Sequence, residues 1–148
     1  MFIASDHAGY QLKEYLKSHL PQMKWVDCGP FDTARVDYPD YADRLVKKIL
    51  ERGADSPGKK VTGVLICGSG QGMAIRANRY RGIRAGLAWN EDSVRLARQH
   101  NDINILCLGA RFTEPELAKK LVELFNATEF EGGRHTGRVE KLERLAES

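Results

Sequence analysis

Short apolar runs and longer amphipathic stretches alternate from one end of the chain to the other. The apolar, β-branched runs predict strands, and segments with apolar residues every three or four positions predict helices. Strands are expected over residues 1–5, 24–27, 61–66, 83–88 and 103–108. Helices are expected over residues 7–20, 41–51, from the turn after the third strand to Asn78, 91–99 and 114–125, and in a charged tail ending near Ser148.

This alternation predicts the fold class. Strands that alternate with helices form a parallel sheet with right-handed crossovers, covered by helices on both faces. We therefore expect one α/β domain over residues 1–148, a doubly wound Rossmann-like sandwich with five parallel strands in the order 2-1-3-4-5 and a C-terminal helix. The polar connection at 53–60 is interpreted as a surface loop. Ligands of such sheets bind beyond the carboxyl ends of the strands, here between the first and third.

Composition narrows the function classes. The net charge is only +3, and the arginines are scattered along the chain. They do not form the basic stripe that is typical of nucleic-acid-binding proteins. No apolar run approaches the roughly 20 residues of a membrane span, and no secretory signal is visible, so a cytoplasmic location is expected. The three cysteines lie far apart without zinc-type spacing, which predicts free thiols and no cysteine zinc site.

The glycine-rich turn at residues 67–72 is the most informative segment. Three glycines in five residues open a helix, and bare amides together with the helix dipole favour an anion. Dinucleotide and phosphatase loops would need Gly or Arg where Met73 stands, and a Walker loop would end in Gly-Lys-Ser/Thr. The turn is therefore predicted to hold another kind of anion, unless its glycines only permit a tight turn.

Cys67 begins this turn. A thiol near a helix N-terminus can have a lowered pKa and act as a nucleophile or base. Taken alone, an inert buried cysteine would be the more common interpretation, and we expect Cys28 and Cys107 to be of that kind.

Other polar residues fall at strand or helix ends. Asp6 is either a helix cap or a ligand contact, and His7 beside it is expected to face the site. His100 and Asn101 end a helix. Either His100 interacts with the helix dipole and Asn101 caps the helix, or the two residues take part in function. Candidate anion ligands are Arg111 after the fifth strand, and Arg134 and Arg138, which are one helical turn apart and otherwise belong to a solvated tail.

Taken in order, several segments resemble the type B ribose-5-phosphate isomerases. They are residues 5–9 (SDHAG), 37–41 (DYPDY), 66–73 (ICGSGQGM), 82–85 (GIRA), 98–102 (RQHND), 108–111 (LGAR) and 131–135 (EGGRH) with Arg138. The resemblance spans nearly the whole chain. Ser69 stands where Thr is common in the family, and a proton shuttle needs only the hydroxyl.

The resemblance implies an aldose–ketose isomerase of ribose 5-phosphate, working without a cofactor or metal. Cys67 would be the base, Ser69 would move protons between the enediolate oxygens, and His100 would open the sugar ring with help from Asp6. The amides of the turn would hold the negative charge, notably those of Gly68, Gly70 and Gly72. Phosphate would bind His7, Arg111, Arg134 and Arg138, and the sugar would contact Tyr38 and Asn101.

The resemblance further implies a homodimer, or a dimer of dimers, whose subunits share the active site. Three alternatives stay open. The substrate could be another phosphorylated sugar, such as allose or galactose 6-phosphate or a tetrose phosphate. The chain could be a phosphate-binding module without activity, or a thiol-dependent hydrolase.

Overall fold

The computed structural model describes residues 1–55 and 60–144. The middle of the connection expected at 53–60 and the end of the helix expected to reach Ser148 lie outside these residues. Within them, no helix is long and apolar enough to cross a membrane.

A parallel sheet forms the middle layer, as predicted. Its strands in the described part of the chain are β1 (Phe2–Ser5), β2 (Val26–Asp27), β3 (Gly63–Cys67), β4 (Ala85–Leu87) and β5 (Ile105–Gly109). All paired neighbours run parallel, and the spatial order is β2-β1-β3-β5-β4. The expected order 2-1-3-4-5 is therefore wrong at its end. The entirely buried β5 pairs with β3, and the short, half-buried β4 occupies the edge.

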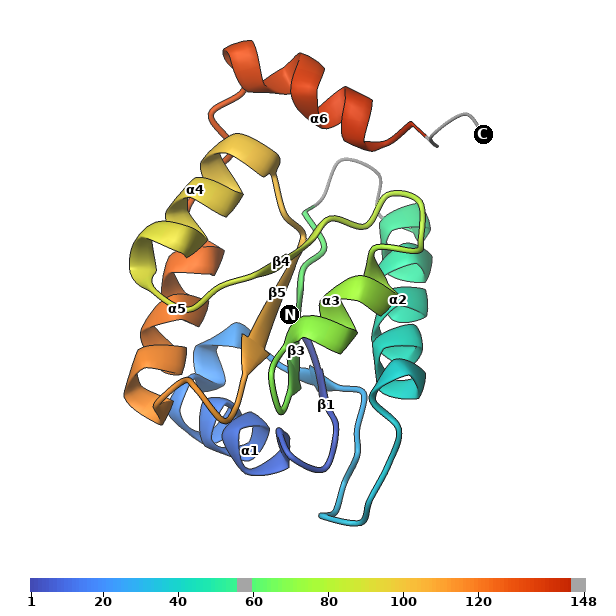
Figure 1. The fold of residues 1–148 in the computed structure, drawn as a ribbon, viewed down its shortest axis with the longest axis vertical. Helices are drawn as coiled ribbons and strands as arrows, with labels where there is room; N and C mark the ends of the chain where they lie inside the picture. The colour runs from blue at the N-terminus through green and yellow to red at the C-terminus, as the bar shows by residue number, and fades with distance from the viewer. Residues whose placement is uncertain (56–59, 145–148) are drawn as a thin grey trace.

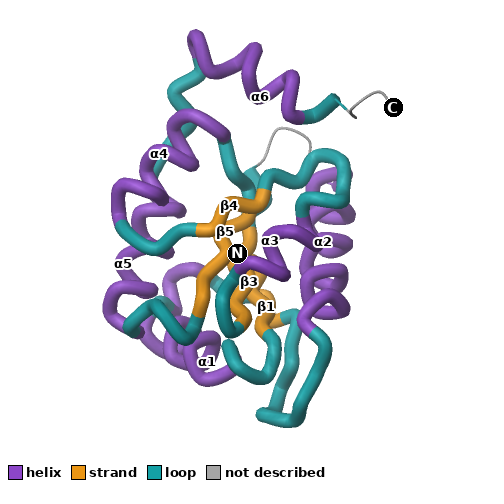
Figure 2. The backbone as a smooth tube through the Cα atoms, in the orientation of Figure 1, coloured by secondary structure: helices purple, strands orange, loops and turns teal. Residues whose placement is uncertain are grey.

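Helices cover both faces of the sheet (Figure 1, Figure 2). On one face, α1 (Tyr10–His19), α4 (Glu91–Asn101) and α5 (Pro115–Ala127) pack over an apolar cluster that includes Ile3, Val64 and Leu106. On the other, α2 (Tyr38–Asp55) and α3 (Gln71–Ala77) cover Leu65 and Cys107. The two clusters follow from the alternation of side chains along each strand, and they confirm the three-layer sandwich.

Helices α1 and α2 differ most from the expected bounds, whereas α4 and α5 differ by one or two residues at an end. α1 begins at Tyr10, because residues after β1 first form a turn in which the Asp6 carboxylate accepts the Gly9 amide at 2.9 Å. Asp6 therefore caps this turn, while the N-cap position of α1 is Gly9. α2 continues through Gly53 to Asp55, beyond the loop boundary that glycine suggested.

The last described helices lie on the far side from the carboxyl ends of the strands. A short 3₁₀ helix, η2 (Gly133–His135), leads into α6 (Thr136–Leu142), which lies beyond the C-terminal end of α4 (Figure 1). α6 is held by Glu143, whose carboxylate pairs with the Arg84 guanidinium and accepts the Gly82 amide at 3.0 Å. Arg84 in turn bonds Asp102 at 2.9 Å. A charged network thus fixes the arm that carries Arg134 and Arg138.

Candidate functional site

The carboxyl ends of β1 and β3 lie side by side at the predicted switch point. The Asp6 amide donates to the Ile66 carbonyl at 3.0 Å. The chain after β1 also approaches β3 closely, since a Cβ on Gly9 would lie 2.5 Å from that same carbonyl oxygen. Asp6 is 7% exposed. The strand pairing therefore brings Asp6 and Cys67 to one edge of the sheet.

Cys67 ends β3 beneath the glycine-rich turn. Its side chain is buried, and the Gly70 amide donates to its sulfur at 3.1 Å. Gly70 has a φ of +78°, and a Cβ there would lie 2.4 Å from a Leu87 methyl carbon, so glycine is required at this position. The exposed Ser69 hydroxyl accepts the Gln71 amide at 3.4 Å. The turn thus directs a backbone N–H at the thiol and presents a hydroxyl beside it.

Two long side chains lie against this turn. The Arg111 amide donates to the Gly68 carbonyl at 3.1 Å, and its guanidinium carbon lies 3.3 Å from where a Gly68 Cβ would be. The Tyr38 ring lies 2.6 Å from the Cβ position of Gly72. A cation therefore lies against the start of the turn and a phenol against its end.

His7 completes this group of residues. Its Nδ1 lies 3.3 Å from the Val36 carbonyl and 3.4 Å from the Val36 amide, in the loop that leads to α2. The ring is exposed. The structure thus assembles one cluster, the thiol cluster, from predicted site residues: Asp6, His7, Tyr38, Cys67, Gly68, Ser69, Gly70, Gly72 and Arg111.

The other two thiols, Cys28 and Cys107, lie outside the glycine-rich turn. Burial, together with the Asp27 charge, raises the pKa of Cys28 to about 11. Burial also raises the pKa of Cys107, which lies inside the sheet with no exposed surface. Both cysteines are free, as predicted. Their neutral thiols fit the inert role expected of them.

The remaining predicted residues lie at the opposite end of the strands, where the strands begin. α4 runs antiparallel to the strands, so its last residues, His100 and Asn101, come just before β5 begins. Gly63 pairs with Ile105 there, whereas Cys67 pairs with Gly109. Those four steps along a strand span about 13 Å. Arg134 and Arg138 are exposed on η2 and α6, at the same far edge. One chain therefore does not bring them to Cys67.

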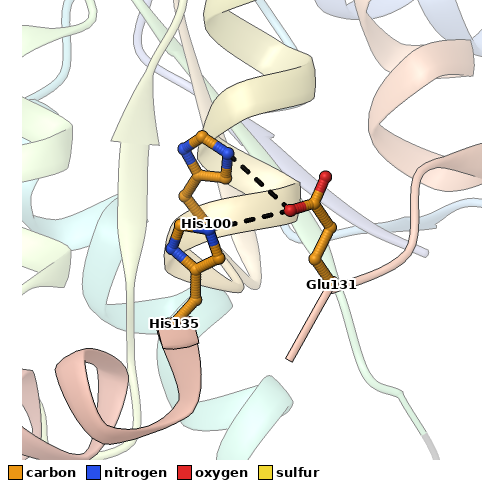
Figure 3. A group of neighbouring side chains, drawn as sticks. All are labelled: His100, Glu131 and His135. Atoms are coloured by element: carbon orange, nitrogen blue, oxygen red, sulfur yellow. Dashed lines mark ion pairs between the residues drawn. The ribbon is translucent and has the colours of Figure 1, made fainter. Parts of the chain in front are cut away.

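A second cluster, the histidine cluster, forms around His100 (Figure 3). The ring of His135 stacks on that of His100, with centroids 4.1 Å apart and planes inclined by 8°. One Glu131 oxygen lies 3.9 Å from Nε2 of His100 and 3.6 Å from Nε2 of His135. Sequence reasoning did not place Glu131 or His135 in the site. No local pattern signals this pair, because Glu131 lies outside any helix, and Gly132 and Gly133 between it and His135 both have positive φ.

Two imidazoles and a carboxylate are also a set of metal ligands. The nitrogen and oxygen atoms of His100, Glu131 and His135 all lie within 4.8 Å of one another, a grouping that no sequence spacing indicated. The rings, however, are nearly parallel, so their in-plane lone pairs do not converge on one point. Arg134 Nε also donates to His135 Nε2 at 3.3 Å. This arrangement therefore suits the transfer of a proton better than the binding of a metal ion.

The chain is similar to known proteins over nearly its whole length. A family model described as "Ribose/Galactose Isomerase" matches residues 1–142. Ribose-5-phosphate isomerase B of Escherichia coli is 40% identical, over 93% of this chain and 89% of its own. The crystal structure of a ribose 5-phosphate isomerase from Thermotoga maritima is 46% identical, with a TM-score of 0.89 and 97% of both chains covered.

A further solved structure includes a sugar phosphate. Ribose-5-phosphate isomerase B of Mycoplasma genitalium, determined with bound ribulose 5-phosphate, is 40% identical to this chain. The match has a TM-score of 0.87 and covers 96% of this chain and 92% of that one.

Proposed function

The chain belongs to the ribose/galactose isomerase family, and on that premise we propose that it interconverts ribose 5-phosphate and ribulose 5-phosphate, with Cys67 as the base. The observation that carries the proposal is the thiol cluster. A buried sulfur receives a backbone N–H from a glycine-rich turn, and Arg111 and Tyr38 flank that turn. These are the parts that an enediolate reaction needs: a base, donors for an oxyanion, and an anchor for phosphate.

The proposed chemistry is a proton transfer between neighbouring carbons. The Cys67 thiolate takes the proton from C2 of the open-chain aldose, and the electron pair moves to the aldehyde oxygen. The resulting enediolate lies against the amides of Gly68, Gly70 and Gly72. Ser69 carries a proton from the C2 oxygen to the C1 oxygen, and Cys67 returns its proton to C1. The product is the ketose, and the enzyme ends as it began.

Ribose 5-phosphate is mainly a closed furanose, so the ring must open first. We assign this step to His100, which moves a proton from the C1 hydroxyl to the ring oxygen, with Asp6 assisting from the thiol cluster. His7, Arg111, Arg134 and Arg138 bind the phosphate, and Tyr38 and Asn101 contact the sugar. The phosphate provides binding energy away from the reacting carbons, which holds the sugar for the transfer.

This assignment requires two subunits. The thiol and histidine clusters lie at opposite edges of one sheet, so a single chain offers no substrate contact to both. In a twofold dimer, the histidine cluster of each subunit faces the thiol cluster of its partner, and each sugar is enclosed by both chains. Two cavities of about 560 and 600 Å³ open at the amino edge of the sheet, and neither is lined by Cys67. The chain alone thus supplies half of each site.

A substrate panel tests the proposal. Ribose 5-phosphate, allose 6-phosphate, galactose 6-phosphate and erythrose 4-phosphate are offered to the wild-type chain, and the isomer formed is followed by NMR. Turnover with ribose 5-phosphate preferred is the expected result. Preference for a 6-phosphate or for the tetrose would keep the mechanism and replace the substrate.

The binding-module alternative is tested on the same samples by thermal shift. The isomerase predicts stabilisation by sugar phosphates over adenine nucleotides. Stabilisation by nucleotides, with none of the sugars turned over, would contradict the proposed function. Release of inorganic phosphate from the sugars would instead favour a hydrolase.

A further inference from the structure

His135 is a buried titratable residue for which the mechanism above gives no task. It is 3% exposed, although Arg134 and Arg138 on either side of it are exposed. We propose that His135 is a positioning residue for His100, fixing the plane of its imidazole and keeping it neutral until it accepts the sugar proton. This inference rests on the ring-opening role assigned to His100 above.

The stacking geometry supports the positioning role. The two rings overlap face to face, with planes 8° apart and centroids at 4.1 Å. His100 lies in the last turn of α4 and His135 in η2, so the two rings are positioned by different elements. The Glu131 amide donates to the Gln99 carbonyl at 3.1 Å, which joins the two segments beside the stack. The His100 ring is thus held from one face, while its side chain stays about one-third exposed.

The charges around the stack favour one neutral ring. Burial lowers the pKa of His135, and the neighbouring His100, Arg134 and Arg138 lower it further, against an opposing effect of Glu131. Arg134 Nε donates to His135 Nε2, which therefore offers its lone pair and carries no proton. Two imidazolium rings in face contact would repel strongly. The pair is consequently built to carry no more than one proton.

Glu131 gives that single proton a favourable place. Its carboxylate oxygen lies within ion-pair distance of both Nε2 atoms, but beyond a direct hydrogen bond to His100. When His100 takes a proton from the sugar hydroxyl, the carboxylate stabilises the imidazolium until the proton passes to the ring oxygen. His135 thus opposes protonation of His100 before the sugar binds, and Glu131 compensates for the positive charge of His100 afterwards.

The pH profile separates this role from a structural one. His135→Phe keeps a flat ring against His100, whereas His135→Leu removes it. With ribose 5-phosphate, His135→Leu should lose about tenfold in kcat, and the acid limb of its kcat/KM profile should move to higher pH. His135→Phe should keep more of the wild-type kcat, because it holds a flat ring against His100, but its acid limb should move as in His135→Leu, because neither side chain can carry the second charge. A limb that stays fixed in His135→Leu would overturn the proposal, because a structural role lowers activity without moving it.

A second measurement isolates the ring step. Ribulose 5-phosphate cannot form a furanose, because its C5 oxygen is phosphorylated, so exchange of its C1 proton with solvent needs Cys67 but no ring opening. His135→Leu should keep this exchange within about twofold of wild type while net turnover falls. Parallel loss of exchange and turnover would overturn the proposal.

A third measurement does not depend on turnover. The titration of the His135 ring is followed by NMR in the wild type and in His100→Asn. The pKa of His135 should rise when His100 is removed, because His100 is one of the groups that lower it. An unchanged midpoint would show that the rings are not coupled and would overturn the proposal. Absence of any sugar-phosphate turnover by the wild type would instead refute the proposed function alone.

Discussion

The ring of Tyr38 lies against the backbone of Gly72, so close that a Cβ on that glycine would be 2.6 Å from two ring carbons. Tyr38 begins α2 and Gly72 lies in the first turn of α3. In Gly72→Ala the ring must move, and because it is 41% exposed it can do so without unfolding the chain. We predict a rise in KM for ribose 5-phosphate of about 5- to 10-fold, equivalent to about 1 kcal/mol of binding, with a smaller change in kcat.

Gly137→Ala is the matched control, because no atom lies within 4 Å of a Cβ at that position. Its thermal stability should equal or exceed that of the wild type, since alanine favours a helix. An unchanged KM in Gly72→Ala would remove Tyr38 from the sugar site.

The proposed division of the site between subunits predicts complementation. Cys67→Ala and His100→Asn should each be nearly inactive, but a dimer of one copy of each contains one intact site. Random pairing makes about half the dimers mixed, so refolding the two together should recover about a quarter of wild-type activity. The activity of the refolded mixture is compared with that of each variant refolded alone. No recovery in a mixture shown to contain mixed dimers would mean that each site lies within one chain.

Much of this arrangement could be predicted from the sequence, but the exchange of β4 and β5 and the contacts of His135 were missed. The alternating apolar patterns placed every strand, and the glycines after β3 marked the tight turn at Cys67. The exchange of β4 and β5 was missed because connectivity alone suggests sequential neighbours. Two physical signs were available: the unbroken apolar run of β5 indicates a central strand, and Arg84, which flanks β4, indicates an edge strand. The stacking of His135 on His100 depends on where η2 lies after α5, which no local pattern encodes.

A buried ion pair near β2 was also not foreseen, and it predicts a stability effect. Lys13 has no exposed side-chain surface, and its Nζ lies 2.8 and 2.7 Å from the two carboxylate oxygens of Asp27. Asp27→Asn leaves that ammonium only the half-exposed Glu14 carboxylate at 3.3 Å, which should cost about 3 kcal/mol in the free energy of unfolding. Adding Lys13→Met should restore much of it. Urea unfolding measures both, and equal stability of wild type and Asp27→Asn would contradict the role of the pair.

The same pair predicts a dependence on pH. Burial alone would raise the pKa of Asp27, but hydrogen bonds from Lys13, Lys17 and Gly29 outweigh it and leave the pKa below its ordinary value of 3.8. A carboxyl with a lowered pKa stabilises the fold above its ordinary pKa and loses this contribution as the pH falls toward the lowered value. The stability gap between wild type and Asp27→Asn should therefore be constant near neutrality and shrink below about pH 4. A gap that persists at pH 3 or widens on acidification would show that another group is responsible.

The attachment of α6 predicts an effect on substrate binding. Glu143 joins α6 to Arg84 and to the Gly82 amide, and the same helix carries Arg138. Glu143→Gln weakens these charged bonds by about 1–2 kcal/mol, and KM for ribose 5-phosphate should rise about 5- to 30-fold. Glu51→Gln, which breaks only the exposed pair with Lys48, is the control and should leave KM unchanged. Equal KM values for the two variants would show that α6 needs no such anchor.

The central claim is that Cys67 moves the proton, and conversion of ribose 5-phosphate by Cys67→Ala tests it most directly. Cys28→Ala removes a free thiol outside the thiol cluster and is the matched control, and circular dichroism verifies that both variants fold. We predict that kcat falls about 10²- to 10⁴-fold in Cys67→Ala and stays near wild type in Cys28→Ala. A folded Cys67→Ala variant that keeps most of the wild-type kcat would contradict the account.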